Sequence, residues 1–136
     1  MRVVRPVLAA GVLTAALASA AQATVVRSAS GPLAATLTAG THSPKAGAQW
    51  PVKVIATLAG RPARAAIVYQ FVFGGQVVSS QIPRYTNGRP HTSFTGTFSD
   101  SLQFPARAVG FPLTLRMHIT AGGRIVNLDY ALQVAR

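Results

Sequence analysis

The sequence predicts an all-β fold, an antiparallel β-sandwich of about seven strands preceded by a signal-peptide helix. Beyond residue 23 no apolar pattern of helical period persists, whereas runs that alternate apolar and polar residues recur. Gly, Pro and Asn residues separate these runs at the spacing expected of a sandwich. The two most regular runs flank Gly122-Gly123, a dipeptide suited to a tight hairpin turn.

Residues 1–23 have the pattern of a signal peptide. Arg2 and Arg5 precede an uncharged apolar run over residues 7–18, and Ala21-Gln22-Ala23 offers small residues at a cleavage site. The preceding Ala-Ser-Ala offers a second cleavage position. The apolar run is shorter than the roughly 20 residues of a membrane-spanning helix, so a retained N-terminal anchor is only the alternative. We expect an extracytoplasmic protein, secreted or at the cell surface, with no transmembrane segment after cleavage.

The chain after residue 23 is strongly basic and has no cysteine. The full sequence has 13 Lys and Arg against 2 acids, and removal of Arg2 and Arg5 leaves 11 − 2 = +9. An exported domain without disulfides must be held together by packing and strand pairing alone. Such a charge attracts polyanions, but the basic residues stand singly rather than in runs. A purely compositional origin of the charge is therefore favoured over a polyanionic ligand.

The first half of the sandwich is expected to hold four strands. Residues 24–32 come before them as a flexible N-terminal segment, and the sandwich domain spans residues 33–136. The third of these strands is the most apolar and should lie centrally in its sheet. A turn at Gly74-Gly75 would pair Phe71 with Val78 and Ile67 with Ile82. The expected strands are residues 33–39, 52–59, 66–73 and 76–82.

The second half is expected to add one irregular strand and a regular hairpin. Residues 92–104 form the irregular strand, with a bulge or break near Ser99-Asp100. In the hairpin, a two-residue turn at Gly122-Gly123 pairs Met117 with Leu128 on the apolar face. The same register sets Arg116 opposite Asp129 on the outer face, so two independent patterns agree.

The stretch Ser43-Pro44-Lys45-Ala46-Gly47, followed by Trp50-Pro51-Val52-Lys53-Val54 and then Gly60-Arg61-Pro62, resembles bacterial immunoglobulin-like modules. This resemblance implies an immunoglobulin-like sandwich over residues 33–136, and it concerns the fold rather than an activity. The Cys–Trp–Cys arrangement of antibody domains is missing, since the chain has no cysteine and Trp50 precedes the second strand. A small closed barrel is the alternative architecture.

The residue types argue against an enzyme. Asp100 and Asp129 are the only acids, so a pair of catalytic carboxylates is not available once Asp129 faces Arg116. Asp100 is expected in a turn or bulge. A histidine–methionine metal site would need Met117 beside His118, but these two residues point to opposite faces. We expect no cofactor and no metal, and a metal-binding carrier is the distant alternative.

The preferred function is a non-enzymatic binding or structural module at the cell surface, whose partner is an unknown protein. The alternative is a cationic envelope protein that binds anionic cell-wall polymers or other polyanions, without specific recognition of nucleic acid. The candidate polyanion contacts are Arg61, Arg64, Arg84 and Arg89. Trp50 and Tyr85 are candidate loop contacts, although a core position is favoured for Trp50.

Overall fold

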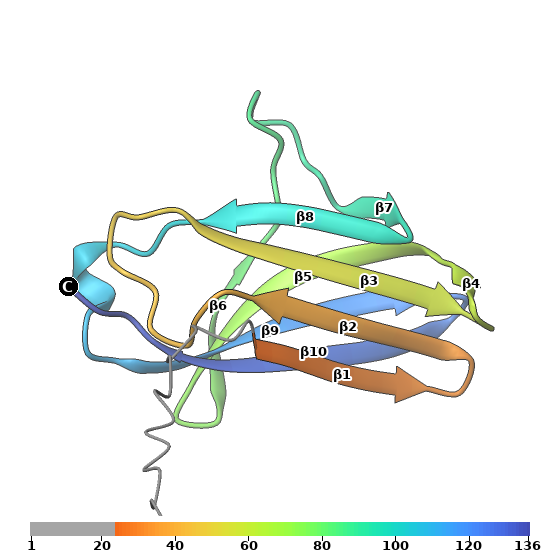
Figure 1. Ribbon diagram of the computed structural model, residues 1–136, viewed down its shortest axis with the longest axis horizontal. Coiled ribbons are helices and arrows are strands. Elements are labelled where there is room, and N and C mark those ends of the chain that lie inside the picture. The colour runs from red at the N-terminus through yellow and green to blue at the C-terminus, as the bar shows by residue number, and fades with distance from the viewer. Residues whose placement is uncertain (1–23) are drawn as a thin grey trace, which may run out of the picture.

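The computed structural model describes residues 24–136, and the expected signal-peptide helix lies outside this range. The described residues form two antiparallel sheets that pack face to face as a sandwich (Figure 1). The predicted all-β sandwich is thus confirmed, and its arrangement is consistent with an immunoglobulin-like fold. The closed barrel is wrong, because no strand pairing joins the two sheets. Within residues 24–136 no helix is long and apolar enough to cross a membrane.

Each sheet has five strands. The first sheet runs in the order β1-β2-β3-β4, and β8 also pairs with β3. Its strands are β1 (Thr24–Ser30), β2 (Leu33–Ala39), β3 (Trp50–Leu58), β4 (Arg61–Pro62) and β8 (Thr97–Leu102). The second sheet runs in the order β10-β9-β5-β6, and β7 also pairs with β5. Its strands are β5 (Arg64–Phe73), β6 (Gln76–Gln81), β7 (Ser93–Thr95), β9 (Pro112–Ala121) and β10 (Arg124–Gln133).

The N-terminal segment is a strand and not the flexible segment that the sequence predicted for residues 24–32. Strand β1 pairs with β2 along its whole length, from Thr24 opposite Ala39 to Ser30 opposite Leu33. The turn uses Gly31, whose φ is 57°. The segment lacks a clear apolar alternation because its half-buried positions are filled mainly by Thr and Ser. Backbone pairing with β2 orders it instead.

The core lies between the sheets and is made of their inward-facing side chains. Buried and exposed positions alternate along β3 and β10, as the sequence predicted. Among residues 24–136 no polar or charged residue is fully buried. The largest fully buried side chains are Tyr69, Tyr130, Phe98, Leu33, Leu37, Ile67, Leu115, Met117, Ile119, Leu128, Val54 and Val134.

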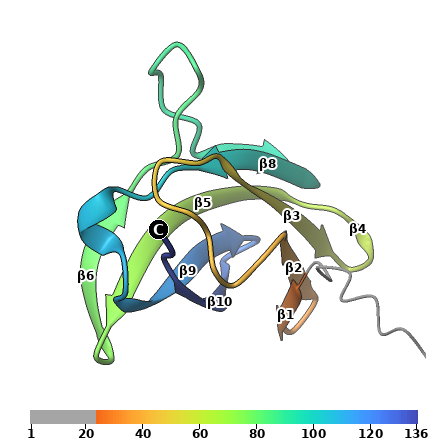
Figure 2. The same ribbon diagram turned by 60° about the vertical axis from the view of Figure 1, so that its left-hand side comes forward.

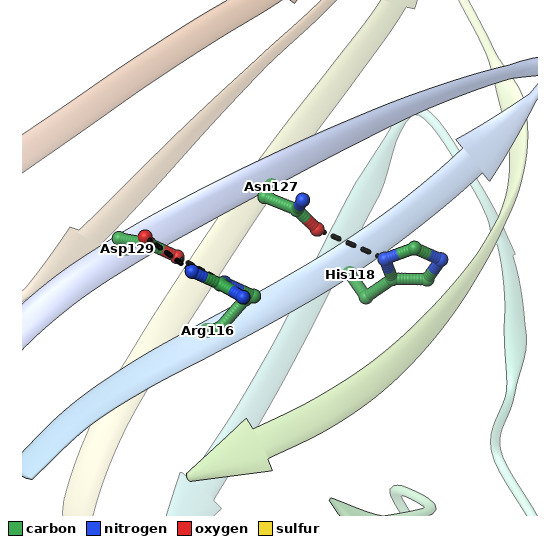
Figure 3. A network of polar contacts seen from close by, with 4 residues as sticks. All are labelled: Arg116, His118, Asn127 and Asp129. Atoms are coloured by element: carbon green, nitrogen blue, oxygen red, sulfur yellow. Dashed lines mark hydrogen bonds and ion pairs between the residues drawn. The ribbon is translucent and has the colours of Figure 1, made fainter. Parts of the chain in front are cut away.

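The predicted C-terminal hairpin is confirmed in its register. Met117 lies opposite Leu128 and Arg116 opposite Asp129. The side chain of Met117 is fully buried, whereas His118 lies on the outer face beside Arg116 (Figure 3). Strand β5 is also central in its sheet, as predicted.

The register predicted for the β5–β6 hairpin is correct only next to the turn. Phe73 pairs with Gln76 and Val72 with Val77, but a bulge then places Phe71 opposite Ser79. The predicted pairs of Phe71 with Val78 and of Ile67 with Ile82 are therefore wrong, because the bulge adds one residue to β6. The predicted break at Ser99-Asp100 is also displaced, since Gly96 separates β7 from β8.

The two long sides of the sandwich are built differently. On one side β1, an edge strand of the first sheet, packs against β10, an edge strand of the second, so the two strands cover each other. On the opposite side β6 ends the second sheet, and β8 pairs only with β3 in the first. We call the first the closed side and the second the open side.

Candidate functional site

A continuous groove separates β6 from β8 on the open side. It has a polar half of about 600 Å³ and an apolar half of about 240 Å³. Gln81 and Leu102 line both halves, which shows that the two hollows adjoin. The apolar half lies beside the beginning of β6 and the end of β8, and the polar half lies beside the end of β6 and the middle of β8. The groove therefore runs parallel to these strands. A groove of this shape fits an extended chain.

The polar half is built around a hydrogen bond that crosses between the sheets. The Tyr69 hydroxyl, from β5, donates to Asp100 Oδ2, from β8, at 2.6 Å. The other carboxylate oxygen accepts the Ser101 backbone N–H at 2.7 Å. Burial, reinforced by the hydrogen bond and the negative charge of Asp100, raises the pKa of Tyr69 well above its usual range. Tyr69 therefore acts as a permanent hydrogen-bond donor.

The position of Asp100 corrects the prediction of a turn or bulge residue. It pairs with Val52 inside the β3–β8 ladder. Its side chain is half-buried because it turns toward Tyr69 of the other sheet. The sequence holds no local signal for this contact, since the two residues are 31 positions apart.

The apolar half is floored by aromatic and aliphatic side chains from both sheets. Phe71 and Phe104 contact each other edge to face, with ring centroids 6.0 Å apart. Leu102 and Leu113 complete the floor, and Val78 of β6 stands at the rim. Val78 is 58% exposed, the highest value among the exposed large apolar side chains of residues 24–136.

Exposed apolar side chains gather on and around β6. Of the nine large ones exposed within residues 24–136, five lie in β6 or beside it. Phe73 and Phe111 contact each other edge to face at the turn end of β6. The five residues are Phe73, Val77, Val78, Ile82 and Phe111. Val78 and Ile82 line the groove, whereas Phe73, Val77 and Phe111 lie outside its lining.

The loop between β6 and β7 projects from the sandwich at the polar end of the groove (Figure 2). It is a small hairpin, in which Tyr85 N–H donates to Arg89 O at 2.8 Å. Arg84 Nη1 donates to Gly88 O at 2.9 Å, and the Tyr85 ring stacks on His91 at 3.9 Å. The structure thus brings together three of the predicted contact residues, Arg84, Tyr85 and Arg89.

The other two predicted arginines lie elsewhere. Arg61 belongs to β4 and Arg64 begins β5, at one end of the sandwich and away from the projecting loop in both views (Figures 1 and 2). The four arginines therefore form two separate groups and no single basic face. Arg84 is the only one of them that lines the groove.

Trp50 is a core residue, as the favoured interpretation predicted, and the alternative of a loop contact is wrong. It begins β3, opposite Leu102, and is 3% exposed. Its Nε1–H donates to Thr41 O at 3.1 Å, which satisfies the one polar atom of the buried side chain. Its ring packs against Phe104 and Tyr130. Strand β3 starts two residues earlier than the apolar alternation indicated.

The histidines have separate partners. His42 stacks on Tyr130 and hydrogen-bonds to Ala131 O. His118 Nδ1 lies 2.9 Å from Asn127 Oδ1 on the outer face of the β9–β10 hairpin (Figure 3). Residues 24–136 contain no group of three or more His, Cys, Asp or Glu side chains that could hold a metal ion.

Beside His118, Arg116 and Asp129 form a two-point ion pair, with Nε–Oδ1 and Nη2–Oδ2 distances of 2.8 and 3.0 Å. The hydrogen bond to Asp129 raises the pKa of Arg116, so the pair stays charged. It is the one ion pair within residues 24–136.

Comparison with known proteins adds no family to this description. A scan against protein-family models found no match, and a search of curated proteins found none that matches. The open side is therefore interpreted from its own chemistry.

Proposed function

We propose that the protein is a non-enzymatic, exported immunoglobulin-like module of the cell surface that binds a partner protein through the groove between β6 and β8. The observation that carries the proposal is the free edge of β6 beside this groove. Five exposed apolar side chains lie on or near β6, and two of them, Val78 and Ile82, line the groove. Contiguous exposed apolar surface on a folded domain is characteristic of interaction sites.

The composition of β6 supports binding along its edge. An unpaired strand edge presents free N–H and C=O groups, and proteins usually protect it with charged residues, proline or a covering element. The sequence of β6 is Gln-Val-Val-Ser-Ser-Gln, with neither a charge nor a proline. No other strand within residues 24–136 pairs with its outer edge. Such an edge can accept an extended segment of another chain as an additional strand.

The polar groups in the groove support binding rather than catalysis. Ser101 Oγ donates to Gln49 Oε1 at 2.7 Å, and Asp100 accepts hydrogen bonds from Tyr69 and Ser101. Among the described residues that line the groove there is no histidine to act as a base for a serine. The raised pKa of Tyr69 keeps its hydroxyl protonated and therefore a poor nucleophile.

A displayed library of random peptides tests the proposal. Selection on the purified protein should enrich peptides that lose binding at least tenfold with Val78→Lys, because Lys puts a charge into the apolar half of the groove. Ile125→Lys, at a 54% exposed residue of β10 on the closed side, is the matched control and should bind as the parent does. Peptides that tolerate Val78→Lys, or no enriched peptide at all, would contradict the proposal.

Attraction to anionic envelope polymers is the second candidate, supported by the charge of residues 24–136. Of their 11 basic residues, only Arg116 has an acid within 4.0 Å. Binding of this kind weakens steeply between about 50 and 200 mM salt, whereas an apolar interface does not. Retention on a polyphosphate matrix that falls equally with Arg61→Gln and with Arg84→Gln would indicate general charge attraction.

A further inference from the structure

We propose that the groove takes an extended segment of a partner protein that carries acidic residues on both sides of an apolar core, and that this segment adds a strand to β6. This inference rests on the proposed function and names the chemistry of the partner. Three features carry it: the charges at the two ends of the groove, the charge of the whole domain, and the length of the groove.

Each half of the groove has an arginine at its wall. Arg84 lines the polar half and Arg107, in the short helix Ala106–Ala108, lines the apolar half. Both are exposed, and within residues 24–136 neither forms an ion pair. The hydrogen bond from Arg84 to Gly88 O uses one nitrogen and ties the side chain to the projecting loop. Two guanidinium groups at the walls of the groove favour carboxylates, which accept their N–H groups in pairs.

Asp100 is the one negative charge in the groove, and its two oxygens already accept hydrogen bonds from Tyr69 and Ser101. It lies in the polar half, so it disfavours a carboxylate directly above it. The partner's acidic residue at this end is therefore expected beside Arg84 rather than above Asp100.

The domain's charge argues against a second copy as the occupant. Residues 24–136 carry 11 basic and 2 acidic residues, a balance of 11 − 2 = +9. Pairing two β6 strands would bring Arg84 and Arg107 of both copies together, and like charges that meet in an interface oppose association. An acidic partner is instead attracted over a distance.

The length of the groove sets the spacing of the segment. Val78 lies in the apolar half with Arg107, and Arg84 follows it by 84 − 78 = 6 residues. Strand β6 ends at Gln81 and carries a bulge, so roughly 20 Å, at about 3.3 Å per residue, is the upper limit of this span. Side chains alternate between faces, so acidic residues about six positions apart point to the same side as the apolar residues between them.

A synthetic peptide tests the inference directly. It has seven residues, with glutamate first and seventh, valine third, leucine fifth and threonine at the other positions. It should bind the purified full chain more tightly than the same peptide with glutamine in place of glutamate, measured by fluorescence anisotropy. Arg84→Gln and Arg107→Gln should each weaken binding of the glutamate peptide about two- to fivefold and leave the glutamine peptide unchanged.

Arg27→Gln is the matched control, because it removes the same charge from an exposed position of β1 on the closed side. Equal loss in all three variants would overturn the inference, since the attraction would then be general. If library peptides require Val78 but the glutamate and glutamine peptides bind equally, the proposed function holds and this inference is wrong. A dimer in analytical ultracentrifugation that Val78→Lys abolishes would identify a second copy as the occupant and also overturn it.

Discussion

The closed and open sides of the sandwich use the same kind of edge strand in opposite ways. On the closed side β1 and β10 pack against each other, and the outward polar side chains of the β9–β10 hairpin pair among themselves (Figure 3). On the open side β6 and β8 stay apart, and a groove with one polar and one apolar half lies between them. The comparison suggests that the closed side contributes stability, whereas the open side retains surface for a partner.

The largest expected effect is on the core below the closed side. Leu128 is fully buried in β10, so Leu128→Ala should lower the free energy of unfolding by about 2–5 kcal/mol. On the open side, Val78→Ala should change it by less than about 0.5 kcal/mol, because Val78 is mostly exposed. Urea unfolding of both variants measures the difference. Similar losses of unfolding free energy in the two variants would contradict the proposed difference between the closed and open sides.

The two buried tyrosines allow a second comparison between the open and closed sides. Tyr69→Phe removes the hydrogen bond between the sheets and leaves Asp100 without this donor, so it should cost about 1–3 kcal/mol. Tyr130→Phe is the matched control, since the Tyr130 hydroxyl is the one buried side-chain polar atom within residues 24–136 that lacks a hydrogen-bond partner. Its removal should cost less than about 0.5 kcal/mol. Thermal or urea unfolding in which Tyr130→Phe is the costlier change would contradict this reading.

The raised pKa of Tyr69 also predicts a dependence on pH. Above about pH 10, the usual pKa of tyrosine, the hydroxyl ionises in the unfolded chain but stays protonated in the folded one. The unfolded state then binds fewer protons, so stability falls as the pH rises. Below that pH the contribution is fully present. Urea unfolding between about pH 9 and 11 should show a shallower decline in Tyr69→Phe, and equal slopes would refute the assignment.

The smallest expected effect is at the ion pair of the closed side. The side chains of Arg116 and Asp129 are 31% and 47% exposed, so water screens their attraction. Asp129→Ala should therefore cost at most about 1 kcal/mol. A double-mutant cycle with Arg116→Ala, repeated at high salt, isolates the pair. A coupling free energy well above this value, or one that salt leaves unchanged, would show that the pair is less solvated than its exposure indicates.

On the closed side the sequence predicted the β9–β10 hairpin correctly but indicated a flexible segment in place of β1. In the β9–β10 hairpin, the apolar alternation and the opposite charges of Arg116 and Asp129 point to one register, and both signals are local. Apolar alternation also predicted β2, and the continuous apolar run of residues 66–73 predicted β5 at the centre of its sheet.

The open side escaped prediction because its features depend on contacts between distant segments. The bulge beside Phe71 shifts β6 by one residue, and no turn or composition signal marks it. Tyr69 and Asp100 meet only because the two sheets pack together. The sequence also does not show which strands lie at the edge of a sheet. The free edge of β6 follows from the order of the strands in the folded sheet. The projecting loop was recognised as a contact candidate because its polar run, Tyr85 to Pro90, is visible in the sequence.

Hydrogen–deuterium exchange along the edge strands is the most direct test of the claim that the open side binds by strand addition. In the free protein, backbone amides of β6 that face away from β5 should exchange quickly, because nothing pairs with them. On addition of the glutamate-flanked peptide they should become protected, while the amides of β1 and β10 stay unchanged. Protection at β1 or β10, or unchanged exchange in β6 at saturating peptide, would contradict the account.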